Sequence, residues 1–416
     1  MKAFKAKSVY TNGCLSSLPL AIENGIVVSS EDIQGDIISF DGMYIFPGFA
    51  DVHVHLREPG FSYKETISSG TLASARGGYT HVFSMPNLSP VPDSVNNLKE
   101  QLDIIKKSAN IHVTPYASIT KGQKGEELSD MQDMAEFVGG FSDDGRGVQD
   151  IKMMEAAMKK AQKLGKIIVA HCEDNSLLKG GYIHDGEYAA KNNHRGICSE
   201  SEWGPIKRDL ELVEKIGCKY HVCHISTKES VDIIRKAKAK GIDVTCETAP
   251  HYLTMTDMDL QEDGRFKMNP PIRSAEDRAA LIEGLKDGTI DMIATDHAPH
   301  SAEEKSKGLS KSMMGVVGIE TAFQVLYTEL VKKGVITLEK LIEVMHINPK
   351  KRFGVEDSLK IGEKACFTVF NLDKKYKIDP EEFKSMGRST PFEGKEVFGK
   401  CMMTVVDGNI AWKEEE

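Results

Sequence analysis

Short apolar runs that alternate with helix-like stretches dominate the middle of the chain. Eight runs of strand-like length occur, at residues 44–54, 81–85, 111–117, 137–141, 167–170, 220–225, 242–246 and 292–295. Amphipathic stretches separate many of them, at residues 64–76, 94–108, 149–164, 203–216, 228–239 and 275–286. Eight strand–helix alternations over roughly 300 residues suit a closed (β/α)8 barrel of the TIM type better than an open doubly wound sheet. Two separate α/β domains remain the alternative that this pattern leaves open.

The two ends of the chain differ from this middle part. Before residue 47, and again from about residue 360, short β-type runs are separated by turns that contain Gly and Asp. Neither end is long enough to bury a core of its own. We therefore expect an α/β protein with two units. The (β/α)8 barrel takes residues 47–359, and a small β-sandwich-like domain is built from residues 1–46 and 360–416.

Charge and composition exclude several classes of function. The 416 residues include 53 Lys and Arg against 62 Asp and Glu, a net charge of −9, so the chain lacks the basic field that a nucleic acid requires. No apolar run reaches the length of about 18 residues needed to cross a bilayer, so we expect no membrane partner. Eight cysteines without a C-x-x-C pair are typical of a reducing compartment, and we expect a cytoplasmic protein.

Histidine and aspartate recur where the predicted strands end. Alternation along a strand puts His53 and His55 on one face. Further His or Asp side chains follow strands four, five, six and eight, at Asp143 or Asp144, His171, His224 and Asp296. The carboxyl ends of barrel strands carry the active site in enzymes of this fold. Four His and at least two Asp exceed what one zinc ion needs, so two metal ions bridged by a carboxylate are the natural inference.

A second group of polar residues suits an anionic substrate. Arg57 lies two residues beyond His55 and therefore on the same face, and a guanidinium binds a carboxylate through paired hydrogen bonds. Asn87, after strand two, and His300, four residues past Asp296, are expected at the same mouth of the barrel.

The motifs around these residues resemble a known family. The segment PGFADVHVHLREPG at residues 47–60 is similar to the opening signature of the amidohydrolase superfamily, and most closely to its class I dihydroorotases. The resemblance continues at residues 64–66, 75–80, 85–87, 143–145, 169–175, 223–229, 267–271 and 294–300. It covers nearly the whole barrel, and the combination of motifs is highly specific although no single one is.

The resemblance implies a metal site with two zinc ions per subunit. The implied ligands of the first ion are His53, His55 and Asp296, and those of the second are His171 and His224. Asp144 would bridge the two ions, a choice over Asp143 that rests on the motif alignment. Many relatives in the superfamily bridge with a carboxylated lysine, but the end of strand four contains no lysine here, and class I dihydroorotases use an aspartate.

The implied activity is the reversible hydrolysis of (S)-dihydroorotate to N-carbamoyl-L-aspartate in de novo pyrimidine biosynthesis. Asp296 is expected to move the proton from the attacking water to the departing ring nitrogen, as general base and then general acid. The implied substrate contacts are His55, Arg57, Asn87, Asn269, His300, Met314 and Gly315. The family resemblance implies that three of these side chains, Arg57, Asn87 and His300, bind a carboxylate of the substrate.

Two other functions remain as alternatives. An allantoinase or hydantoinase shares the scaffold, although those enzymes generally use the bridging lysine and Arg57 favours a carboxylate-bearing substrate. An inactive homologue that serves as a scaffold for aspartate transcarbamoylase would lack metal ligands, whereas all six positions are filled here. A homodimer and an association with aspartate transcarbamoylase are partner hypotheses that the sequence does not decide.

Overall fold

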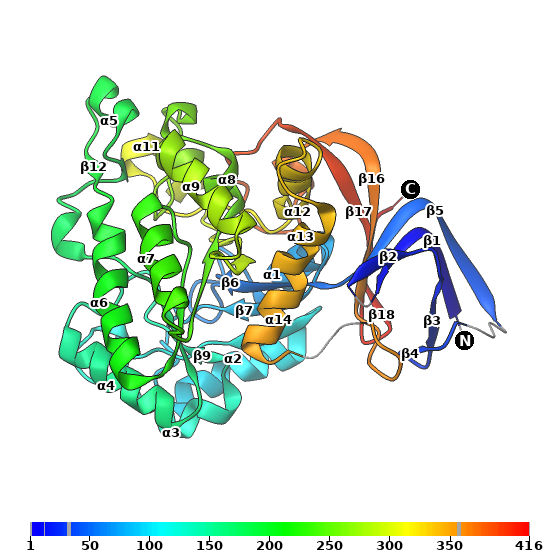
Figure 1. The fold of residues 1–416 in the computed structure, drawn as a ribbon, viewed down its shortest axis with the longest axis horizontal. Helices are drawn as coiled ribbons and strands as arrows, with labels where there is room; N and C mark the ends of the chain where they lie inside the picture. The colour runs from blue at the N-terminus through cyan, green and yellow to red at the C-terminus, as the bar shows by residue number, and fades with distance from the viewer. Residues whose placement is uncertain (1, 12, 31–34, 356–358, 416) are drawn as a thin grey trace.

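The computed structural model describes residues 2–11, 13–30, 35–355 and 359–415, and eight parallel strands form its centre. In Figure 1 this central part lies at the left, and strands from both ends of the chain lie side by side at the right. These strands are β6 (Phe49–Val54), β7 (Tyr79–Ser84), β8 (His112–Pro115), β9 (Gly140–Phe141), β10 (Ile167–Ala170), β13 (Lys219–Val222), β14 (Val244–Thr248) and β15 (Met292–Ile293). Strands β6, β7 and β8 pair in that order, and β9, β10, β13, β14 and β15 form a second parallel run.

Two short contacts close these runs into a barrel. A bridge pairs Ala117, just beyond β8, with Phe141 of β9. A second bridge pairs Val54 of β6 with His297, just beyond β15, and there the amide of His55 donates to the His297 carbonyl at 2.8 Å. The predicted (β/α)8 barrel is confirmed, and its seam lies beside the residues expected to bind metal.

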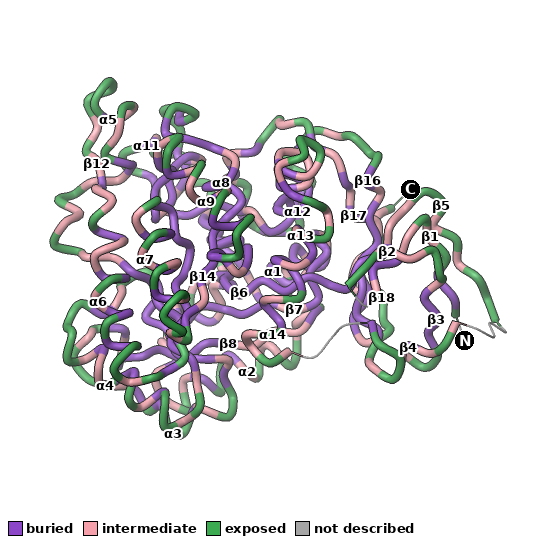
Figure 2. The backbone as a smooth tube through the Cα atoms, in the orientation of Figure 1, coloured by how far each residue is buried: buried purple, intermediate pink, exposed green. Residues whose placement is uncertain are grey.

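Helices follow the strands, and the longer ones cover the outside of the barrel. The helices are α1 (Ile67–Arg76), α2 (Val95–Ser108), α3 (Met131–Met134), α4 (Ile151–Lys163), α5 (Glu187–Asn192), α6 (Glu200–Ile216), α7 (Lys228–Ala239), α8 (Pro250–Thr254), α9 (Ala275–Lys286), α10 (Ala302–Lys305), α11 (Gly308–Lys311), α12 (Ala322–Leu326), α13 (Leu338–Ile342) and α14 (Asn348–Phe353). Figure 2 shows exposed positions on the outer turns of helices such as α4 and α6, and buried ones along the strands. Within the described ranges, no helix is long and apolar enough to cross a membrane.

Capping side chains fix where several of these helices begin. Thr66, Ser94, Asp150, Thr227 and Ser274 each accept a hydrogen bond from the backbone N–H three residues further on. Such a cap satisfies a donor that the first helical turn leaves free, and its loss costs about 1 kcal/mol. The polar residue before each amphipathic stretch therefore sets the helix start.

The strands from both ends of the chain form one sheet. They are β1 (Lys2–Thr11), β2 (Cys14–Ser16), β3 (Leu20–Glu23), β4 (Ile26–Val28), β5 (Asp36–Pro47), β16 (Phe367–Lys377), β17 (Glu396–Val406) and β18 (Asn409–Lys413). Their order is β18-β17-β16-β5-β1-β3-β4, with β2 paired to β1. The N-terminal strand β5 pairs antiparallel with the C-terminal strand β16, for example through Ile45 and Val369. The division into domains at residues 46 and 360 stays a prediction.

Aromatic side chains pack where the terminal sheet meets the barrel. Phe46 of β5, Phe49 of β6, Phe323 of α12 and Phe370 of β16 are all fully buried. The rings of Phe323 and Phe370 lie 4.3 Å apart, and Phe49 stacks on Phe323 at 5.3 Å. Burial of this much aromatic surface is a principal source of stability at the contact.

Two of the expected strands differ from those in the structure. Residues 44–54 are not one strand: β5 ends at Pro47 and β6 begins at Phe49, because the first belongs to the terminal sheet and the second to the barrel. A Cβ on the intervening Gly48 would lie 2.1 Å from the side chain of Thr80, so this close approach requires glycine. In residues 137–141 only Gly140 and Phe141 form a strand, and Phe137 ends a 3₁₀ turn on the surface.

The aromatic contact gives a test of the fold. Phe370→Ala should lower the free energy of unfolding by about 3–5 kcal/mol, because it removes a fully buried ring from a close-packed cluster. Urea denaturation measures this change. Leu18→Ala is the matched control, since Leu18 is 66% exposed, and it should change stability by less than about 0.5 kcal/mol. A loss for Phe370→Ala as small as the control's would contradict the packing described.

Candidate active site

A cavity of about 240 Å³ opens where the barrel strands end at their carboxyl side. It is lined by His55, Arg57, Asn87, Asp144, Gly145, His171, His224, Asn269, Asp296, Ala298, His300, Met313, Met314 and Gly315. The structure therefore brings together eleven of the twelve residues predicted from the sequence. The twelfth, His53, lies next to the others and is fully buried. Gly145, Ala298 and Met313 line the cavity as well and were not predicted.

The carboxylate of Asp144 lies at the centre of the histidine cluster. Its Oδ1 is 3.3 Å from His53 Nε2, 3.4 Å from His171 Nδ1 and 3.6 Å from His224 Nε2. Its Oδ2 is 3.5 Å from His55 Nε2. One carboxylate thus faces all four predicted imidazoles, which come from three different strand ends.

Asp296 completes the cluster on the side of strand β15. Its Oδ1 lies 3.1 Å from His55 Nε2 and 3.5 Å from His53 Nε2. Burial disfavours the charged form of this carboxyl, but the hydrogen bond with His55 and the nearby charge of His53 outweigh burial and lower its pKa. The backbone of Asp296 has a φ of +46°, a strained conformation for a residue with a side chain. The side chain is therefore held ionised and in a fixed direction.

Asp143 has a different role from its neighbour. Its carboxylate accepts hydrogen bonds from the backbone amides of Ile119 and Thr120 and from the Thr120 hydroxyl. It therefore holds the segment after β8, while Asp144 faces the histidines. This geometry distinguishes two adjacent acids that the spacing of the sequence leaves equivalent.

The donor set of the cluster suits metal ions. Buried His53 Nε2 and Asp144 Oδ1 find no hydrogen-bond partner among the described residues. His53, Asp144 and His224 can converge on one ion, as can His53, His55 and Asp296. Imidazole and carboxylate are the ligands that zinc takes in catalytic sites. These His and Asp clusters could therefore bind metal.

A metal ion in this cluster must compete with protons for the histidine nitrogens. Burial alone would lower the pKa of His171, yet the hydrogen bonds and charges of Asp144 and Glu173 raise it to about 10. Without another cation, the acids would thus keep this ring protonated at neutral pH. A metal ion that uses the ring nitrogen must displace that proton.

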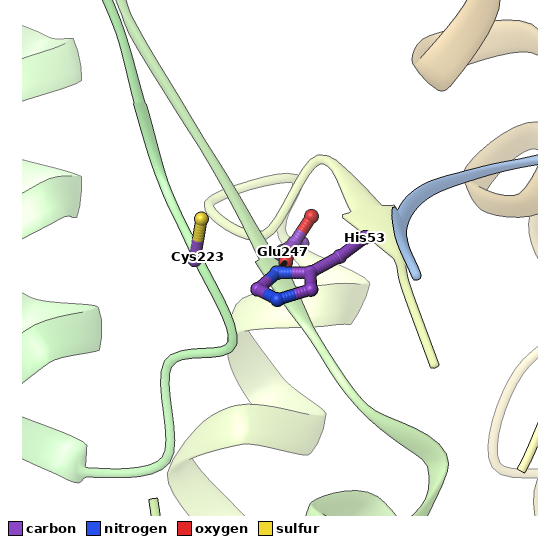
Figure 3. A group of neighbouring side chains, drawn as sticks. All are labelled: His53, Cys223 and Glu247. Carbon is purple, nitrogen blue, oxygen red and sulfur yellow. Dashed lines mark hydrogen bonds and ion pairs between the residues drawn. The ribbon is translucent and has the colours of Figure 1, made fainter. Parts of the chain in front are cut away.

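Glu247, at the end of β14, is a residue of the site that the sequence reasoning missed. Its Oε1 lies 2.7 Å from His53 Nδ1, and its Oε2 lies 3.0 Å from His221 Nε2. The backbone amide of His224 also donates to it, at 3.2 Å. Figure 3 shows Glu247 directly beside the His53 ring, with Cys223 nearby on the segment that follows β13. Because Glu247 accepts from Nδ1 of His53, it fixes the tautomer of this ring and orients Nε2 towards Asp144.

Arg57 and His300 form one wall of the cavity. The Arg57 guanidinium is anchored by its Nε, which donates to the Pro299 carbonyl at 3.1 Å, and its Nη2 lies 3.4 Å from His300 Nε2. Burial and the charges of Arg57 and Lys64 lower the pKa of His300 to about 3. The neutral ring of His300 donates through Nε2 to the Met314 carbonyl at 2.8 Å, while Lys64 lies 3.3 Å from Nδ1.

Two asparagines, Asn87 and Asn269, also line the cavity. The Asn87 Nδ2 donates to the Asp144 carbonyl at 2.6 Å, and the Asn269 Nδ2 donates to Glu173 at 2.8 Å. The side-chain oxygens of both asparagines are buried and lack a partner within the described part of the chain. Each therefore offers an acceptor to a bound molecule.

A buried lysine holds the segment that contains Met314 and Gly315. Lys305 donates to the carbonyls of Lys267, Met313 and Gly315, at 3.0, 2.8 and 2.7 Å. Burial lowers the pKa of this ammonium to about 7. The backbone beside His300 is thus fixed by three hydrogen bonds to one side chain.

Comparison with known proteins agrees with this geometry. A family model described as dihydro-orotase-like matches residues 42–230. The chain is 48% identical over 410 residues to a dihydroorotase of Bacillus thuringiensis (strain Al Hakam), covering 97% of this chain and 96% of that protein. A dihydroorotase of Bacillus cereus (strain G9842) is 49% identical over the same length and coverage.

Solved structures agree in fold. An L-hydantoinase (dihydropyrimidinase) from Arthrobacter aurescens superposes with a TM-score of 0.88 at 25% identity, covering all of this chain and 96% of that one. A D-hydantoinase (dihydropyrimidinase) from Thermus sp. gives a TM-score of 0.85 at 21% identity, over 100% of this chain and 97% of that one, and shows the fold alone. On the extent of its identity to the Bacillus proteins, the chain belongs to the dihydroorotase family.

Proposed function

We propose that this chain hydrolyses (S)-dihydroorotate reversibly to N-carbamoyl-L-aspartate, a step in de novo pyrimidine biosynthesis in the cytoplasm. One observation carries the proposal: five members of a cluster of four His and two Asp line a small cavity together with Arg57, in a chain 48% identical to dihydroorotases. The cluster suits amide hydrolysis, and the arginine suits the carboxylate of this substrate.

Two zinc ions per subunit are the proposed cofactor. His53, His55 and Asp296 would hold the first ion, His171 and His224 the second, and Asp144 would bridge them. When bound, such ions activate water at neutral pH and polarise the amide carbonyl. Support for this assignment comes from the position of Asp144 within 3.6 Å of a nitrogen of each histidine.

Asp296 would transfer the proton during ring opening. Its ionised carboxylate accepts a proton from the attacking water and then donates it to the ring nitrogen as the amide bond breaks. In the reverse direction the same group takes the proton from that nitrogen. The low pKa of Asp296 favours the unprotonated starting form.

The residues around the metal cluster would bind the substrate. Arg57 would bind the carboxylate of the substrate together with the second Nδ2 hydrogen of Asn87. The Nε2–H of His300 would have to turn from the Met314 carbonyl to join them. His55 would contact both the metal and the substrate. Asn269, with the backbone at Met314 and Gly315, would contact the ring. The free acceptor oxygen of Asn269 suits a ring N–H.

The alternatives are distinguished by substrate. A hydantoinase or allantoinase, which would share the fold, would hydrolyse its own cyclic amide in preference to dihydroorotate. An inactive scaffold protein would hydrolyse none of these substrates. Partnership with a second copy of the chain, or with aspartate transcarbamoylase, stays a prediction.

Turnover of three cyclic amides tests the proposed function. Zinc-loaded protein should open dihydroorotate much faster than hydantoin or allantoin, as followed by ultraviolet absorbance. Asp296→Asn should reduce the rate by about 10²–10⁴-fold in both directions, because the proton carrier is lost. Asp150→Asn, a helix cap on the surface, is the matched control and should keep full activity. Equal or greater turnover of hydantoin or allantoin, or none of dihydroorotate, would refute the proposal.

Substitution of the arginine tests its role in selecting the carboxylate. Arg57→Met should raise KM for dihydroorotate by about 10- to 100-fold, the equivalent of a lost charged hydrogen bond, with a smaller effect on kcat. Steady-state kinetics measure both constants. Dihydrouracil lacks the carboxylate, so its turnover should respond little to the same substitution. A KM for dihydroorotate that stays at the wild-type value would contradict the assigned role.

The carboxylate behind His53 gives a test of the metal site. Glu247→Gln should weaken zinc binding by about 10- to 100-fold, because a neutral amide is a weaker acceptor for His53 and has no second oxygen for His221. Competition with a chelator measures the affinity. Glu262→Gln is a matched control, since Glu262 accepts from His194 at 2.8 Å on the surface. Equal zinc affinities in the two variants would show that Glu247 does not support the site.

A further inference from the structure

A second group of metal-ligating side chains lies away from the active site. His112 begins β8 of the barrel, Cys366 immediately precedes β16, and Asp407 occupies the turn between β17 and β18. One nitrogen, one sulfur and one carboxylate oxygen from these residues all lie within 4.8 Å of one another. Three segments that are far apart in the sequence thus meet where the barrel contacts the terminal sheet.

The distances between these atoms match those around a tetrahedral ion. His112 Nε2 lies 3.2 Å from Asp407 Oδ1, and Cys366 Sγ lies 3.5 Å from the same oxygen. A tetrahedral zinc ion, with bonds of about 2.0 Å to N and O and about 2.3 Å to S, keeps N and O about 3.3 Å apart and S and O about 3.5 Å apart. Two of the three separations therefore match those of such a tetrahedron, and the third, between the His112 nitrogen and the Cys366 sulfur, is below 4.8 Å.

Charge also favours a divalent cation at this place. A Cys thiolate and an Asp carboxylate carry two negative charges, and a neutral imidazole adds none. Lys364 Nζ lies 2.8 Å from Asp407 Oδ2 and adds one positive charge, so the thiolate, carboxylate and ammonium together leave one net negative charge for a cation to compensate. The backbone amide of Asp407 lies 3.3 Å from Cys366 Sγ and can donate to the sulfur, which favours the thiolate.

An ion can reach the group from solvent. A cavity of about 350 Å³ is lined by His112 and Asp407, together with residues 109–111, 406 and 409–411. The side chains of His112 and Asp407 are 42% and 28% exposed, while Cys366 is buried behind them. Lys364 binds the other carboxylate oxygen, Oδ2, at 2.8 Å and leaves Oδ1 facing the two remaining groups. The fourth position is thus free for water.

We propose that His112, Cys366 and Asp407 form a second metal site, separate from the catalytic cluster, that binds a zinc-type divalent ion. The thiolate selects a borderline-soft ion such as Zn²⁺ over Mg²⁺ or Ca²⁺. The bound ion joins a barrel strand to the terminal sheet. Because this site contains a sulfur ligand and the assigned catalytic ligands contain none, the two sites differ in their spectra.

Cobalt titration of the holoenzyme tests this site. With the active-site metal in place and a phosphine reductant present, Co²⁺ should bind at one additional equivalent per chain and produce a thiolate-to-cobalt charge-transfer band in the near ultraviolet. Cys366→Ser should abolish this band. Asp407→Asn, a change in a surface turn that leaves the fold intact by circular dichroism, should weaken the cobalt affinity by about tenfold or more.

Other thiols provide the controls. Cys14→Ser removes the exposed cysteine and should leave the band unchanged. Cys223 lies close to His53 and Glu247, so a band from that thiol would persist in Cys366→Ser. A wild-type holoenzyme without the band, or a band that survives in Cys366→Ser, would overturn the proposal. Unchanged cobalt affinity in Asp407→Asn would do so as well.

Discussion

The site depends on a single buried carboxylate that faces four imidazoles. Asp144 lies within 3.6 Å of a nitrogen of His53, His55, His171 and His224. Together with Asp296 and Glu247 it concentrates negative charge where little water can reach. Such a group of acids is costly to bury unless cations compensate it, either protons on the histidines or metal ions between them. The high pKa of His171 and the low pKa of Asp296 are two results of this one constraint.

Contacts between barrel strands position His53 relative to Asp296. Buried Asp51, in β6, accepts hydrogen bonds from the His53 amide at 3.0 Å and from the Thr295 hydroxyl at 2.6 Å. Burial raises the pKa of Asp51 to about 7, despite these hydrogen bonds. The same carboxylate therefore fixes the strand that carries His53 and the segment that leads into Asp296. Glu247, on β14, reaches His53 past the intervening strand β15, so the ligand geometry follows from contacts between different strands.

Much of this arrangement could be predicted from the sequence, because it depends on local patterns. Alternating apolar runs predict the barrel, and polar residues directly after the runs predict His171, His224, Asp296 and either Asp143 or Asp144. Glu247 was missed because a single acid at a strand end carries no spacing signal, and only folding shows that it reaches His53. The pairing of β5 with β16 could not be foreseen either, since strand order depends on contacts more than 300 residues apart. The group of His112, Cys366 and Asp407 could not be predicted either, because its members come from segments that are far apart in the sequence.

In the proposed metal site, Asp144 would lie between two ions held by the surrounding histidines and Asp296. Diffraction from crystals of zinc-loaded protein, recorded on both sides of the zinc absorption edge, tests this assignment. Two anomalous peaks are expected in the cavity, one on the side of His53, His55 and Asp296, the other on the side of His171 and His224, with Asp144 contacting both. A single peak, or peaks that Asp144 does not contact, would contradict the assignment.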